Sequence, residues 1–127
     1  MIKVLRPWGY KSRTAFFKDL NVDNKVFNEM VRHSDWQVQK AALLHKKCPS
    51  SARLYVINSS PGNSRWYKRL VAYFSPYSEY EIWIMAETDS DKRIQKLFDR
   101  QANYEQRLSK YIDDASHEIL LGGDDDS

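Results

Sequence analysis

The chain has 127 residues, 42% of them apolar and 29% charged, which is ordinary for a single soluble globular domain. Its single cysteine excludes a disulfide framework and a cysteine-based metal site. No apolar run is long enough to cross a bilayer, and the first residues lack the pattern of a secretory signal peptide. We therefore expect a cytoplasmic protein with no membrane span.

Charge is unevenly distributed along the chain. Residues 1–78 hold 14 Lys or Arg and 4 Asp or Glu, whereas residues 79–127 hold 6 Lys or Arg and 13 Asp or Glu. The net charge of +3 therefore conceals a basic first part and an acidic end. This asymmetry predicts an acidic partner for the first part, although two solvated faces of opposite bias would produce the same pattern.

A phrase that begins at a tryptophan recurs along the chain. Equivalent positions fall at steps of 28, 30 and 26 residues, at Trp8, Trp36, Trp66 and Lys92. A period of this size is typical of repeat proteins in which each unit is one supersecondary element. The recurrence predicts four units, at about residues 6–33, 34–63, 64–89 and 90–115.

Each unit is predicted to open with a helix of about three turns, because apolar residues recur at one helical face after the marker. In the second unit these residues are Val38, Ala41, Ala42 and Leu44. In the last three units a serine two places before the marker is expected to cap this helix, at Ser34, Ser64 and Ser90. In the first unit Pro7 takes the first helical position instead.

A turn and a second apolar stripe follow in every unit. Pro49 marks the turn of the second unit. Ser78 with Glu81 has the spacing of a capping box in the third unit, and Asn103 with Gln106 has the same spacing in the fourth. The second stripes begin at equivalent positions, Val26, Leu54, Ile82 and Leu108.

These patterns predict an all-α fold, a short α-solenoid of about four helix pairs wound as a right-handed superhelix. The solenoid would form a single domain over residues 1–119. Residues 120–127 follow the last apolar period and are rich in aspartate, which predicts a disordered acidic tail.

An α+β fold is the alternative. The segments RLYVIN (53–58), KRLVAYF (68–74) and YEIWIM (80–85) are rich in β-branched and aromatic residues and could form a three-stranded meander. Strand propensity depends strongly on context, whereas the repeat accounts for the chain from residue 7 to about residue 113. The repeat is therefore the favoured interpretation.

Residues 34–60 resemble one unit of the HEAT-like and variant leucine-rich repeat proteins. The resemblance rests on packing residues, namely Asp35, Trp36, Val38, Ala41, Ala42, Cys48 and Pro49. Residues 87–108 resemble the next-but-one unit, and the other two match only in outline. The resemblance implies an α-solenoid whose stacked helix pairs share one core, and proteins of this build are mostly binding scaffolds.

No pattern in the sequence predicts catalysis, a metal or a cofactor. His33, His45 and His117 are scattered, and Cys48 with His45 would supply only two ligands. None of the four glycines belongs to a phosphate-binding loop. We expect Cys48 to be a buried turn residue and the protein not to be an enzyme.

One basic residue falls on the polar side of the opening helix in every unit. These residues are Lys11, Lys40, Arg69 and Lys96, and Arg65 and Lys68 lie near them in the sequence. In a solenoid they would stack into an exposed ridge that attracts phosphates or a carboxylate-rich surface. Exposed Lys and Arg are also simply good helix formers.

The first functional hypothesis is a non-catalytic binding module with a regulatory or inhibitory role, whose partner is a protein with an acidic surface. The second is a nucleic-acid-binding repeat protein in which the ridge contacts DNA or RNA. The third is a small basic ribonuclease-like α+β protein built on the meander. In its small size and acidic tail the chain resembles accessory proteins of bacteria or their phages. The sequence leaves the oligomeric state open.

Overall fold

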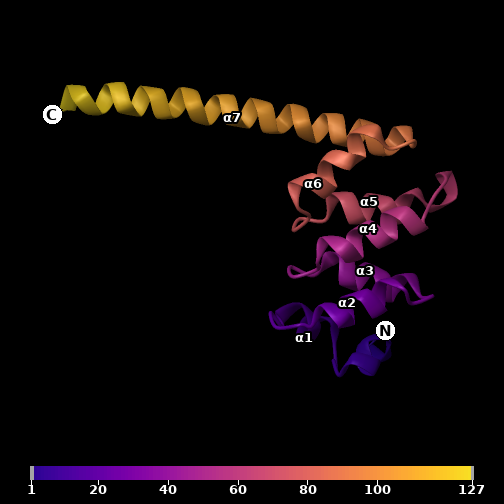
Figure 1. The fold of residues 1–127 in the computed structure, drawn as a ribbon. Coiled ribbons are helices and arrows are strands. Elements are labelled where there is room, and N and C mark those ends of the chain that lie inside the picture. The colour runs from indigo at the N-terminus through magenta and orange to yellow at the C-terminus, as the bar shows by residue number, and fades with distance from the viewer. Residues whose placement is uncertain (1, 127) are drawn as a thin grey trace.

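The computed structural model describes the backbone of residues 2–126 and the side chains of residues 5–110 and 112–114 (Figure 1). Every regular element in this range is helical. In chain order they are the 3₁₀ helix η1 (Ile2–Trp8), α1 (Arg13–Lys18), α2 (Asn24–Val31), α3 (Trp36–Leu44), α4 (Ser50–Ser59), η2 (Asn63–Arg65), α5 (Trp66–Phe74), α6 (Tyr80–Trp83), η3 (Ile84–Thr88) and α7 (Lys92–Asp126).

The fold is all-α, as the repeat predicted, and the α+β alternative is wrong. The three segments expected to pair as a meander lie in α4, in α5, and in α6 with η3. In α4 the buried residues Ala52 and Val56 are one helical turn apart, which is a helical and not an alternating pattern. The ribonuclease-like hypothesis required that sheet, so it loses its structural basis.

Helices α2 to α6 contact neighbours one or two places along the chain. α2 contacts both α3 and α4, α3 contacts α5, and α4 contacts both α5 and α6. Figure 1 shows α3 and α5 running in one direction and α2 and α4 in the other, so that the connections preceding α3, α5 and α7 lie on one side. The arrangement of helix pairs as a solenoid and its right-handed superhelix stay predictions.

The core follows most of the predicted apolar stripes, but Leu43 is buried in place of Leu44, and the second stripe of the fourth unit, which begins at Leu108, is exposed. Its fully buried members come from each of the first three units and from the start of the fourth, and they include Phe16, Phe27, Met30, Val38, Ala42, Leu43, Val56, Ala72, Ile82, Ile94 and Phe98. Burial of each large apolar side chain contributes about 1.5–3 kcal/mol to folding. The apolar faces that carry these buried residues are therefore covered by neighbouring helices, and this packing stabilises the helices in water.

Two of the three predicted serine caps are wrong by one residue. The carboxylate of Asp35, and not Ser34, accepts a hydrogen bond from the Gln37 amide at 2.8 Å and caps α3. Asp91 stands in the same place before α7 and accepts from the Arg93 amide at 2.8 Å. The helices begin at the marker itself, so the capping position is the residue directly before it.

The third unit also departs from its predicted turn chemistry. α5 begins at Trp66 without any side-chain cap, so Ser64 does not cap it. Ser78 is not part of a capping box, because its hydroxyl donates to the carbonyl of Ala72 at 3.1 Å and so closes the end of α5.

The first unit does not open with a helix at Pro7. Pro7 and Trp8 end η1, and Gly9 then reverses the chain with a positive φ of 88° that L side chains rarely adopt. α1 begins only at Arg13, capped by the Ser12 hydroxyl at 3.1 Å from the Ala15 amide. Trp8 nevertheless lies half-buried against the core, as its place in the repeat predicted.

The fourth unit is one long helix rather than a helix pair. α7 passes through Asn103 and Gln106, where a turn was expected, and continues to Asp126. It also includes residues 120–126, for which the sequence predicted a disordered tail, while Ser127 lies outside the described residues. No proline interrupts it, and a glycine inside a helix costs only about 1 kcal/mol.

None of the helices described is long and apolar enough to cross a membrane.

Candidate functional site

The structure keeps five of the six predicted binding residues at or near the surface and buries the sixth. Lys11, Lys40, Arg65 and Lys96 are exposed, and Lys68 is half-buried. Arg69 is only 4% exposed, so its predicted place on an exposed ridge is wrong.

Arg69 is buried between two connections of the chain, the one before α5 and the one before α7, and its side chain bonds to both. Its Nε and Nη2 donate to the two carboxylate oxygens of Asp89 at 2.9 and 3.1 Å. Its Nη1 donates to the carbonyl oxygens of Ser60 and Gly62, both at 2.7 Å. Tyr73 donates its hydroxyl to the same carboxylate at 2.7 Å. Arg69 therefore has a structural role, which uses four of its five N–H donors.

The Asp89 carboxylate is held ionised by these donors. Burial alone would raise its pKa, but the hydrogen bonds from Arg69, from the Asp91 amide and from Tyr73 outweigh burial and lower the pKa. The pKa of Tyr73 is raised, first by burial and then by its bond to Asp89. A satisfied buried network of this kind fixes the geometry of the chain around it.

The starts of α1, α3, α5 and α7 are linked in series. The Arg13 guanidinium donates to the Gln37 amide oxygen at 2.9 Å and so connects α1 with α3. The Trp36 ring meets Tyr67 edge-on at 5.3 Å between ring centroids and connects α3 with α5. Through these contacts the odd-numbered helices present their first turns along one side of the stack.

Two tryptophans on this side each receive a cation from the following unit. The Lys68 ammonium lies 5.7 Å from the centroid of the Trp36 ring, and the Arg93 guanidinium lies 4.0 Å from that of Trp66. Such cation–aromatic contacts stabilise exposed sites by about 0.5–1 kcal/mol each. These contacts pack each tryptophan against the unit that follows it.

We call this side the basic edge and define it by Lys40, Arg65, Lys68, Arg93 and Lys96. Lys40 follows Trp36 by four residues and Lys96 follows Arg93 by three, spacings that place each pair on one helical face. Among the described side chains, Lys40, Arg65, Lys68 and Lys96 form no ion pair.

Two carboxylates at the basic edge are already engaged. Asp35 and Asp91 accept hydrogen bonds from backbone amides at the starts of α3 and α7. The Arg93 side chain also donates to Asp91 at 2.8 Å, and this bond is the main cause of a lowered Asp91 pKa of about 2. These carboxylates therefore neutralise the helix termini and Arg93, and leave the lysines of the edge uncompensated.

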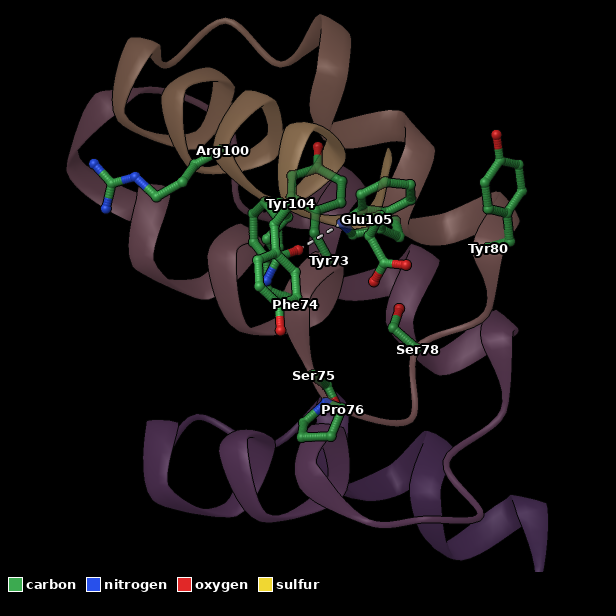
Figure 2. Close-up of a pocket in the computed structure, with 11 residues that line it drawn as sticks. Tyr73, Phe74, Ser75, Pro76, Ser78, Tyr80, Arg100, Tyr104 and Glu105 are labelled. Carbon is green, nitrogen blue, oxygen red and sulfur yellow. Dashed lines mark hydrogen bonds between the residues drawn. The ribbon is translucent and has the colours of Figure 1, made fainter. Parts of the chain in front are cut away.

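A second surface feature is an aromatic groove of about 820 Å³, formed where the end of α5 meets α6 and α7. Tyr73 and Phe74 of α5, Tyr80 and Trp83 of α6, and Tyr104 of α7 line it. In Figure 2, Tyr73, Phe74 and Tyr104 lie together, while Tyr80 extends away from them. Large apolar grooves with a few polar groups are the usual form of a binding site.

No pattern in the sequence pointed to the groove. Tyr104 reaches it only because α7 continues straight through Asn103, where a turn was expected. The half-buried Trp83 stacks on Phe98 with ring centroids 4.5 Å apart. Its indole nitrogen donates to Gln101 at 2.8 Å, which fixes α7 against α6 at the edge of the groove.

His45 and Cys48 are structural in their observed contacts. The buried His45 Nε2 lies 2.9 Å from the carbonyl oxygens of both Phe16 and Asp19, and its Nδ1 accepts from the Lys47 amide at 2.9 Å. Burial raises the pKa of the Cys48 thiol to about 11. The described side chains contain no group of three or more His, Cys, Asp or Glu that could hold a metal ion.

Comparison with protein-family models, curated proteins and solved structures found no match to this chain. The resemblance to HEAT-like and variant leucine-rich repeat proteins therefore stays a prediction.

Proposed function

We propose that the chain is a non-catalytic binding module that binds the acidic surface of a partner protein through the basic edge. The observation that supports this function is the set of exposed or half-exposed cations, Lys40, Arg65, Lys68 and Lys96, which form no ion pair among the described side chains. Uncompensated charge of one sign on one surface attracts a surface of the opposite sign and speeds association.

The basic edge favours a protein over a single-stranded nucleic acid. Single-stranded nucleic acids bind by stacking their bases on free aromatic faces beside a basic groove. Here the Trp66 ring already has Arg93 over it, and the Trp36 ring has Lys68 over one part and Tyr67 against another. The basic edge therefore has cations that a partner protein could bind, but few free aromatic rings on which a nucleic-acid base could stack.

The proposal is tested by affinity capture from the source cell with two charge-reversed variants. Lys40→Glu with Lys68→Glu reverses two charges on the basic edge, whereas Lys25→Glu with Lys46→Glu reverses two exposed charges elsewhere. We expect the first pair to lose the captured partner and the control pair to retain it. Equal retention by both pairs would contradict the proposal.

A second measurement separates the two classes of partner. The purified partner, a 20-nucleotide single strand and the corresponding duplex are titrated against the wild-type chain over a salt series. We expect the partner's affinity to fall with salt, as screening at about 0.1 M reduces the range of exposed charges to about 10 Å. Oligonucleotide binding that is stronger than partner binding and is lost in Lys40→Glu would favour the nucleic-acid hypothesis instead.

A further inference from the structure

The second half of α7 has no packing partner in the described structure. Tyr104 and Glu105 line the groove beside the body, and Gln101 and Ala102 make the last packing contacts of α7 with it, through Trp83 and through the core. Beyond them the helix runs to Asp126 and projects far past the stacked helices in Figure 1. At 1.5 Å per residue, the projecting segment is about 36 Å long.

An apolar stripe lies along this projecting segment. Tyr104, Leu108 and Ile112 follow each other at intervals of four residues, so they share one face of the helix. Their side chains are 64%, 40% and 52% exposed. An isolated helix of this length is marginal in water, and helices in proteins owe most of their stability to a packed apolar face.

The charges of α7 are separated along its length. Residues 92–110 hold six Lys or Arg and two Asp or Glu, whereas residues 111–127 hold no Lys or Arg and six Asp or Glu. Two parallel copies of this helix would place like charges side by side. Two antiparallel copies would place the basic half of each against the acidic half of the other.

We propose that two copies of the chain associate through antiparallel packing of their α7 helices, with the Tyr104–Leu108–Ile112 stripe at the centre of the contact. A two-fold axis near Leu108 places Tyr104 of one copy opposite Ile112 of the other. This interface is self-complementary, as a two-fold contact requires. The apolar stripe shares no residue with the basic edge, although Arg93 and Lys96 of the edge lie in the basic half of α7.

The same arrangement covers part of the aromatic groove. Tyr104 lines the groove, and Arg100 stands at its margin, one helical turn before Tyr104. With the axis near Leu108, Ile112 of the second copy lies at the mouth of the groove. The acidic residues that follow Ile112 then run beside Arg100, which places opposite charges together.

The first test measures the mass of the full chain in solution by light scattering over a concentration series. We expect a dimer that dissociates on dilution, and a monomer for the double variant Leu108→Glu with Ile112→Glu. Leu20→Glu is the matched control, since Leu20 is as exposed as Ile112 but lies outside α7. Circular dichroism checks that each variant remains helical. A wild-type monomer at every concentration would overturn the proposal.

Disulfide cross-linking then tests the direction of packing. Leu108 lies near the proposed axis. The two introduced cysteines of a Leu108→Cys dimer should therefore form a disulfide between the copies on mild oxidation. Tyr104→Cys alone should not cross-link, but a mixture of Tyr104→Cys and Ile112→Cys chains should. Efficient cross-linking of Tyr104→Cys with itself would show parallel packing and overturn the antiparallel arrangement.

Discussion

Arg69 on α5 and Asp89 before α7 are joined by two parallel hydrogen bonds, of 2.9 and 3.1 Å, in a site that solvent barely reaches. The same guanidinium also binds the carbonyls of Ser60 and Gly62. One side chain therefore holds the connection before α5 to the connection before α7. These are the connections that position the basic edge, so the stability of this network and the shape of the edge are linked.

Loss of Arg69 should be strongly destabilising. Arg69→Met leaves the buried Asp89 carboxylate without its main partner, and breaking one side of a buried ion pair costs about 3–5 kcal/mol. Arg65→Met, four residues earlier and exposed, should change the free energy of unfolding by less than about 0.5 kcal/mol. Urea unfolding of the two variants measures both effects. Equal, small losses would show that the Arg69–Asp89 pair does not hold the fold together.

Asp89 should also make stability depend on pH in the acid range. Its folded pKa is lowered below 3.8, so the ionised form stabilises the native state. That contribution is complete above about pH 4 and decreases as the pH falls through the folded pKa. In Asp89→Asn, unfolding free energies measured between pH 6 and pH 2 should be lower at pH 6 and should decline less on acidification. An unchanged acid profile would exclude this role.

Replacement of Arg53 should stabilise the fold, whereas replacement of Arg69 should destabilise it. Its side chain is as deeply buried, but Nη1 and Nη2 have no hydrogen-bond partner among the described residues, and burial lowers its pKa. A buried charge without partners is costly, and an apolar replacement of similar volume can stabilise a protein by about 1–4 kcal/mol. Arg53→Met should therefore raise the midpoint of urea unfolding. A fall as large as that of Arg69→Met would contradict this expectation.

The contrast between these two arginines shows what the sequence could not supply. The period of the apolar residues was sufficient to predict helices near α3, α4 and α5, because a helical face repeats in the sequence itself. It assigned Arg69 to the polar face by the same rule. Only the tertiary structure brings Asp89, twenty residues away, into reach of that side chain. Long-range partners of this kind leave no local pattern.

The fourth unit shows a second limit. Asn103 and Gln106 have the spacing of a helix cap, but the same residues are acceptable inside a helix when no proline or tertiary contact forces a turn. The structure continues α7 through them, and both the exposed stripe and the groove beside Tyr104 follow from that continuity. The candidate binding lysines were accessible to sequence reasoning because exposed charge is a local property. The groove was not.

The helix caps provide a local test of the corrected boundaries. Asp35→Ala removes the side chain that accepts the Gln37 amide and should lower the free energy of unfolding by about 1 kcal/mol. Ser34→Ala, one residue earlier and exposed, should have little effect. Thermal unfolding of both variants checks the assignment. A larger loss in Ser34→Ala would place the start of α3 where the serine pattern predicted it.

Cys48 provides a chemical measure of how well the turn between α3 and α4 is packed. The thiol is buried and its pKa is raised to about 11, so at pH 8 only about one molecule in a thousand carries the reactive thiolate. Alkylation by iodoacetamide at pH 8 should therefore be at least about 100-fold slower in the native protein than in denaturant.

The control for Cys48 moves the thiol to a nearby exposed position. Ser51→Cys in a Cys48→Ser background places a cysteine in the first turn of α4, where the residue is exposed. This variant should be alkylated rapidly without denaturant, because its thiol is solvated and the raised pKa depends on burial. Mass spectrometry over time gives both rates. If native Cys48 reacts as fast as the thiol introduced by Ser51→Cys, the turn opens readily, and the connection between α3 and α4 is then packed less tightly than the burial of Cys48 indicates.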